Sequence, residues 1–192
     1  MKRLFLATSL LALSTSFALA QTSTWASDPA HSEVDFSIRH LGISNVHGRF
    51  GNVNATIAYN EADVTKSTVT ATIDVSTVDT GVAQRDTHIK SPDFLDVATY
   101  STATFTSTSV AKKGSTLEVA GNFTLHGVTK PIVLEVEAPD APIVGMMDHK
   151  PHRGFSATTT LSRAAFAIGP KFPEAIVGDA VKLTIELEAV KQ

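Results

Sequence analysis

The chain has 192 residues, no cysteine and a formal net charge of −3 at pH 7. This length suits one domain, and a mildly acidic chain without basic clusters argues against nucleic acid or anionic lipid headgroups as partners. The absence of cysteine excludes a disulfide framework and thiol catalysis, so packing alone must stabilise the fold.

The first twenty residues have the pattern of an export signal. Lys2 and Arg3 form a positive start, an apolar run covers 4–13, and Ala18-Leu19-Ala20 matches a small-x-small cleavage site. The apolar run is too short for a transmembrane helix. We therefore predict a signal peptide at 1–20, a periplasmic location, and one domain over 21–192. Removing Lys2 and Arg3 would take the formal charge from −3 to −5.

Residues 25–75 predict three strands. Val34, Phe36 and Ile38 share one parity, and the same alternation recurs over 49–59 and 67–75. Gly42 and Gly48 are predicted to bracket a turn between the first two strands.

The alternation stops between residues 80 and 99. Ser91-Pro92-Asp93 is typical of a helix start and predicts one or two short helical turns beginning before Phe94. Arg85, Asp86 and His88 are the densest ionisable group of the chain. They fit a catalytic site or an ion-paired structural group, and the structural interpretation is favoured because such networks commonly have no chemical role.

Alternation resumes over 102–112 and continues over 117–137, where it predicts a hairpin that turns at His126-Gly127. Each arm has one apolar and one polar face, because the side chains of a strand point alternately to opposite sides. An isolated hairpin is marginal in water, so its apolar face requires more sheet to cover it.

The last third contains two irregular segments and two strands. Residues 138–153 include Met146 and Met147, adaptable apolar side chains that suit either a surface loop or a lid. Strands are predicted over 155–161 and 181–188, separated by an interruption at 163–178. The total is about eight antiparallel strands, and closing them into a barrel removes the exposed edges.

Small residues on the apolar parity favour a hollow barrel over a side-chain-filled one. Ala55, Ala71, Ala103 and Ala157 are examples, and an eight-stranded barrel can hold one small ligand. His40 continues the inward parity past Ile38 and is either a hydrogen-bonded core histidine or a polar contact at the mouth. The candidate ligand-binding residues are Phe36, Ile38, His40, Phe50, Phe94, Phe105, Phe123, Leu125, Met146, Met147, Phe155, Leu161 and Phe166.

Several ordered motifs resemble the YceI-like family of periplasmic proteins. They are the segments 25–40, 85–94, 121–136 and 177–181, together with Tyr100, Phe105, Ser162-Arg163 and Phe166. The resemblance covers nearly all of 21–192, although the loop around Met146 does not match the family pattern. It implies an all-β, elongated, lipocalin-like antiparallel barrel whose apolar tunnel binds long isoprenoid or other amphiphilic chains, including prenyl quinones.

Three other functions were weighed against a lipid carrier. An integral membrane barrel would need aromatic girdles, which one Trp and two Tyr cannot supply. A hydrolytic or metal-binding periplasmic enzyme is the alternative, but the common catalytic motifs are absent. His149 and His152 are a poor zinc signal by spacing. We therefore expect no enzyme activity, no cofactor, no metal and no stable membrane insertion; homodimer formation stays open.

Overall fold

The computed structural model describes residues 22–137 and 139–192, so the predicted signal peptide at 1–20 lies outside the described residues. The described strands are β1 (Thr22–Ser27), β2 (Glu33–His40), β3 (Ser44–Phe50), β4 (Val53–Asn60), β5 (Thr68–Asp74), β6 (Thr102–Lys113), β7 (Thr116–Leu125), β8 (Val128–Glu137), β9 (Ile143–Val144), β10 (Pro151–Ser162) and β11 (Val177–Lys191). The helical elements are η1 (Pro29–His31), η2 (Val64–Lys66), η3 (Val75–Thr77), α1 (Ala83–Lys90) and η4 (Ala164–Phe166). Among the described residues, no helix is both long and apolar enough to cross a membrane.

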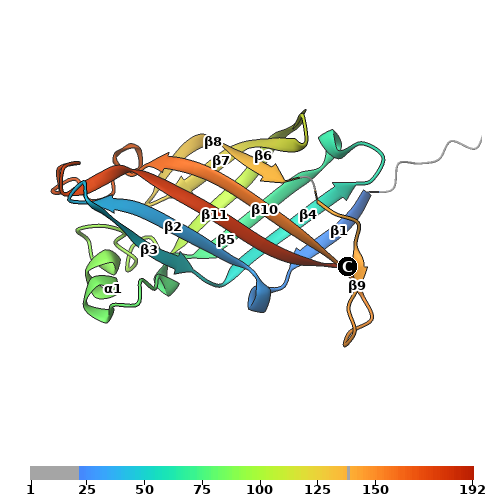
Figure 1. Cartoon of the computed structure of the whole chain (residues 1–192), viewed down its shortest axis with the longest axis horizontal. Coiled ribbons are helices and arrows are strands. Elements are labelled where there is room, and N and C mark those ends of the chain that lie inside the picture. The colour runs from blue at the N-terminus through green and yellow to red at the C-terminus, as the bar shows by residue number, and fades with distance from the viewer. Residues whose placement is uncertain (1–21, 138) are drawn as a thin grey trace, which may run out of the picture.

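These strands form one closed antiparallel barrel (Figure 1). Consecutive strands β1 and β2 both pair with the same side of β11. On their other side, β4 pairs with β1 and β3 pairs with β2. β1 and β2 therefore act as one interrupted strand, and β3 and β4 as another. β10 pairs with the other side of β11 and with β8, which closes the ring, while β9 is a short arm beside β10. The predicted all-β, eight-stranded antiparallel barrel with a short helical insertion is confirmed.

The barrel is elongated along β11. Trp25 of β1 pairs with Lys191, whereas His40 of β2 pairs with Val177 at the other end of that strand. The two positions on β11 are 14 residues apart, which is roughly 45 Å at about 3.3 Å per residue. The barrel therefore has two distant ends, and side chains of matching parity can lie at very different heights.

The predicted hairpin is present as β7 and β8. His126 and Gly127 both have positive φ, 52° and 72°, as a two-residue turn of type I′ requires. The register then places Val119 opposite Leu134 and Leu117 opposite Val136. The apolar parity of the sequence thus becomes the inner face of two adjacent barrel strands.

Gly48 does not bracket a turn, contrary to the prediction. It lies inside β3, and the turn is formed by residues 41–43. A Cβ atom on Gly48 would lie 2.5 Å from Cζ of Phe36 on the neighbouring strand. Glycine is present here because an inward aromatic ring approaches the backbone closely.

The turn predicted to begin at Ser91 is present at 92–95, where the Ser91 hydroxyl oxygen accepts from Asp93 N–H at 3.3 Å, but the helix of this segment lies before Ser91 and not after it. α1 ends at Lys90, and Ser91 is its C-cap, with an N–H and a hydroxyl that both donate to the carbonyl of His88 at 3.1 and 2.7 Å. Pro92 disfavours the helical conformation in the residue before it, and Ser91 accordingly has ψ 169°. The serine–proline pair therefore ends a helix in this chain.

We predict that Gly121→Ala destabilises the barrel by about 1–3 kcal/mol, the usual cost of overpacking a filled core. The new Cβ would lie 2.5 Å from the Phe105 ring and 2.6 Å from the carbonyl oxygen of Thr106. Gly154→Ala on β10 is the matched control, because its Cβ would meet nothing within 4 Å. Urea unfolding midpoints measure both variants, and equal midpoints would contradict the close approach.

Candidate functional site

A cavity of about 320 Å³ lies at the end of the barrel that carries α1. Its walls come from inward side chains of β2, β3, β5, β6, β7, β10 and β11, and α1 and the segment 163–177 lie around its mouth. Most of the lining is apolar, so the site offers hydrocarbon contacts and few hydrogen-bonding groups. The lining residues include Val34, Val46, Ile73, Ala103, Val181 and Leu183.

Nine of the thirteen candidate residues lie along this cavity. They are Phe36, Ile38, His40, Phe50, Phe94, Phe123, Leu125, Leu161 and Phe166. Phe105 is buried in the adjoining core, where its ring packs over Gly121 and not into the cavity. Met146 and Met147 are 91% and 96% exposed beyond β9.

Phe155 belongs to a separate cluster at the opposite end of the barrel. Its neighbours there include the buried Trp25 and Ile57. The guanidinium of Arg153 lies over the rings of Trp25 and Tyr59, 5.0 and 4.3 Å from their centroids. Stacking of a cation on aromatic faces fills this end with side chains. Phe155, a candidate ligand-binding residue, therefore lies in a different cluster from Phe36 and does not line the cavity.

Arg163 holds the irregular segment beside the mouth of the cavity. Its side chain is buried and donates six hydrogen bonds, at 2.5 to 3.2 Å, to backbone carbonyls of the segment 168–178. An irregular segment has carbonyls that no strand partner satisfies, and the five-donor guanidinium supplies the partners. Arg163 thereby fixes the loop that carries Phe172 and Ile176.

An aromatic pair lies across the mouth. The rings of Phe94 and Phe172 stack with centroids 4.7 Å apart, and His88 of α1 contacts both rings edge-on. Lys171 donates to Asp93 at 2.6 Å and joins the same two segments. This hydrogen bond, and the positive charge of Lys171, hold the pKa of Asp93 below its usual value. The cluster joins the segments at 93–94 and 171–172 beside α1.

The Arg85 and Asp86 side chains converge on Thr80. Asp86 Oδ1 accepts from the backbone N–H and the hydroxyl of Thr80 at 2.9 and 2.5 Å. The hydrogen bond from the hydroxyl is the main cause that lowers the pKa of Asp86. Arg85 donates to the hydroxyl and carbonyl oxygens of the same residue at 2.7 and 2.8 Å. The group anchors the start of α1, with Thr80 joining the two charges. Arg85 and His88 also line the cavity.

His40 lies at the mouth and is exposed to solvent. Beside it, the backbone N–H of Leu41 donates to the carbonyl of Ile176 at 2.8 Å, which joins the β2–β3 turn to the loop held by Arg163. Leu41, Ile43 and Ile176 are 51%, 78% and 41% exposed, so they form an apolar rim around the mouth. His40 and the neighbouring Arg39 are therefore polar side chains beside a largely apolar entrance.

Sequence reasoning missed several lining residues. Phe172, Ile176 and Ile168 lie in an interruption without strand periodicity, so no parity assigned them to a face. Arg85, His88 and Ile89 come from α1, and the helix position itself was misjudged. The available signal was the concentration of apolar residues in the irregular segment 163–178.

Comparison with known proteins agrees with this fold. The YceI-like domain model matches residues 25–189. A UPF0312 protein of Vibrio cholerae is 42% identical over 143 residues, covering 72% of this chain and 73% of that protein. The crystal structure of the Campylobacter jejuni YCEI protein has 31% identity and a TM-score of 0.71, covering 81% of this chain and 90% of that one. A polyisoprenoid binding domain from Saccharophagus degradans shares the fold at 18% identity and a TM-score of 0.64, covering 90% of this chain and all of the other. The chain belongs to the YceI-like family.

Proposed function

We propose that this protein binds a long-chain isoprenoid or related amphiphilic lipid, such as a prenyl quinone, and carries or sequesters it in the periplasm. The observation that carries the proposal is the apolar cavity bordered by Phe36, Phe123 and Leu161. Burying roughly 500 Å² of a hydrocarbon chain contributes about 12 kcal/mol before the costs of ordering and association reduce it. Such a site needs no chemical group to act on its ligand.

The cavity volume sets an expectation for the ligand. About 320 Å³ is at the lower end of the roughly 300–1,000 Å³ found for ligand pockets. A short apolar segment fits without rearrangement. A longer chain needs the Phe94–Phe172 pair to move, or must leave its head group outside, at the apolar rim of Leu41, Ile43 and Ile176.

The polar groups around the cavity favour binding over catalysis. Arg163 is engaged by backbone carbonyls, and Arg85 by Thr80. His88 lies against two phenylalanine rings. These contacts hold the mouth in shape. The name of the Saccharophagus neighbour, a polyisoprenoid binding domain, supports the same class of ligand.

We expect an organic extract of the natively purified protein to contain a bound lipid, detectable by mass spectrometry. Ile38→Trp should lower the recovered lipid at least tenfold, because the larger ring enters the cavity. Ser37→Trp is the matched control, since Ser37 pairs with the exposed His47 and Lys182 on the outer face. Equal recovery from both variants, with both folded by circular dichroism, would show that the ligand lies elsewhere.

His40→Leu tests selectivity at the mouth. The neutral imidazole can donate to or accept from a head-group oxygen, a contact worth about 1 kcal/mol, or roughly fivefold in affinity. We expect the variant to keep its affinity for a prenyl hydrocarbon and to lose this preference for a prenyl quinone of matched length. Competition binding in both proteins measures the ratio, and an unchanged ratio would assign His40 a structural role.

The periplasmic location has its own test. Intact mass of the exported protein should show a chain that begins at Gln21, recovered in the soluble periplasmic fraction, as the Ala18-Leu19-Ala20 pattern predicts. An intact N-terminus, or recovery with membranes alone, would contradict export and cleavage.

A further inference from the structure

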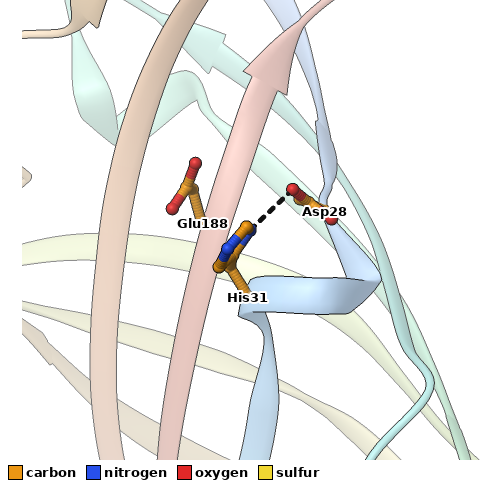
Figure 2. Close-up of side chains that lie close together, drawn as sticks. All are labelled: Asp28, His31 and Glu188. Atoms are coloured by element: carbon orange, nitrogen blue, oxygen red, sulfur yellow. Dashed lines mark hydrogen bonds and ion pairs between the residues drawn. The ribbon is translucent and has the colours of Figure 1, made fainter. Parts of the chain in front are cut away.

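A group of metal-ligand side chains lies outside the cavity, toward the closed end. Figure 2 shows Asp28, His31 and Glu188, which converge from the β1–η1 turn and from β11. One ligand atom from each residue lies within 4.8 Å of the other two. Because Glu188 is distant from the other two in sequence, no short motif could reveal this group, and the sequence predicts no metal site.

The backbone holds these three residues in register. The N–H of Asp28 donates to the carbonyl of Glu188 at 2.7 Å, and the N–H of Glu188 donates to the Ser32 hydroxyl at 3.2 Å. Asp28 Oδ1 caps η1 by accepting from Ala30 N–H at 2.9 Å, and Oδ2 is directed to His31 Nδ1 at 2.8 Å. With the main chain fixed, only the side chains need to move when a ligand binds.

His152 of β10 extends the group. Its Nδ1 is 2.7 Å from Glu188 Oε1, and its Nε2 is 3.0 Å from both carboxylate oxygens of Asp148. The side chain is only 15% exposed. Asp148 therefore orients the ring, with Nδ1 facing Glu188. A carboxylate behind the second nitrogen of a histidine is the usual arrangement around metal-bound imidazoles.

Carboxylates surround both imidazoles. Asp28 Oδ2 lies 2.8 Å from His31 Nδ1, Asp148 lies 3.0 Å from His152 Nε2, and Glu188 Oε1 lies 2.7 Å from His152 Nδ1. This concentration of negative charge beside two imidazoles favours a cation at that place.

We propose that Asp28, His31, His152 and Glu188 form a binding site for a divalent transition-metal ion of the Zn²⁺ type. Two imidazoles and two carboxylates give four ligands and two negative charges, which match a tetrahedral dication. Ca²⁺ and Mg²⁺ prefer six or more oxygen ligands, so the imidazoles select against them. At bond lengths of about 2.0–2.2 Å, tetrahedral ligands lie roughly 3.5 Å apart. One ligand atom each of Asp28, His31 and Glu188 already lies within 4.8 Å of the other two, and His152 Nδ1 lies 2.7 Å from Glu188 Oε1.

A metal at this position would join three barrel segments. Asp28 and His31 flank the interruption between β1 and β2, whereas His152 and Glu188 lie on the paired strands β10 and β11. The site is distinct from the lipid cavity, whose lining includes none of these residues. It is therefore independent of the proposed function.

The test is calorimetric titration of Zn²⁺ into the exported, chelator-treated protein at pH 7.5. We expect one equivalent bound, with a dissociation constant in the micromolar range or below, and no heat with Ca²⁺. His31→Ala and His152→Ala should each weaken binding at least tenfold, and Asp148→Asn about tenfold. His47→Ala removes an exposed histidine of β3 and should leave the affinity within twofold.

Two results would overturn the proposal: no saturable Zn²⁺ binding by the folded wild-type protein, or equal affinities in wild type and the His31→Ala/His152→Ala double variant. Circular dichroism of each variant checks folding. Ile38→Trp distinguishes the metal site from the lipid cavity. This variant should bind Zn²⁺ like the wild type, whether or not it retains lipid.

Discussion

The hydrogen bonds of the buried Arg163 side chain are the constraint on which the open end of the barrel depends. A charged group removed from water is costly unless its donors are satisfied, and here the carbonyls of Ile168, Gly169, Phe172, Val177 and Gly178 satisfy them. The same bonds satisfy carbonyls that the irregular segment cannot place in the sheet. These hydrogen bonds hold the segment 163–178 in place at the mouth, and its side chains Phe166 and Ile168 line the cavity.

The interior of the barrel is filled by side chains at one end and hollow at the other. At the Trp25 end, one large ring, Phe155 and the stacked Arg153 fill the space between the strands. At the α1 end, the barrel wall is completed by a helix and loops whose side chains meet across a gap of about 320 Å³. A closed end and a hollow end on one elongated sheet give a pocket with a single direction of insertion, which suits a chain-like ligand with a polar head.

Much of this fold follows from the alternation of apolar and polar residues along the strands. The predictions that failed show which information this alternation does not contain. Alternation predicted β7, β8 and β11 because each buries one face, and the residues 126–127 could form the turn. Parity gives the side of the sheet but not the height along it, so Phe155 and Phe36 looked equivalent although they lie at opposite ends. The helix was predicted after Ser91 and lies before it, because serine before proline suits both ends of a helix. Contacts between segments distant in sequence, as at Arg163 or between Asp28 and Glu188, leave no local pattern.

The mouth cluster is built from contacts that are individually weak. The exposed Lys171–Asp93 pair is screened by solvent and contributes little, and an aromatic stack such as Phe94–Phe172 adds about 0.5–1.5 kcal/mol beyond the burial of its rings. The two segments are therefore joined by weak contacts that loop movements can break. Arg163, with six hydrogen bonds, stays in place while this happens. A loop held firmly by Arg163, beside a weakly held aromatic pair, would allow the proposed ligand to enter and leave without unfolding the barrel.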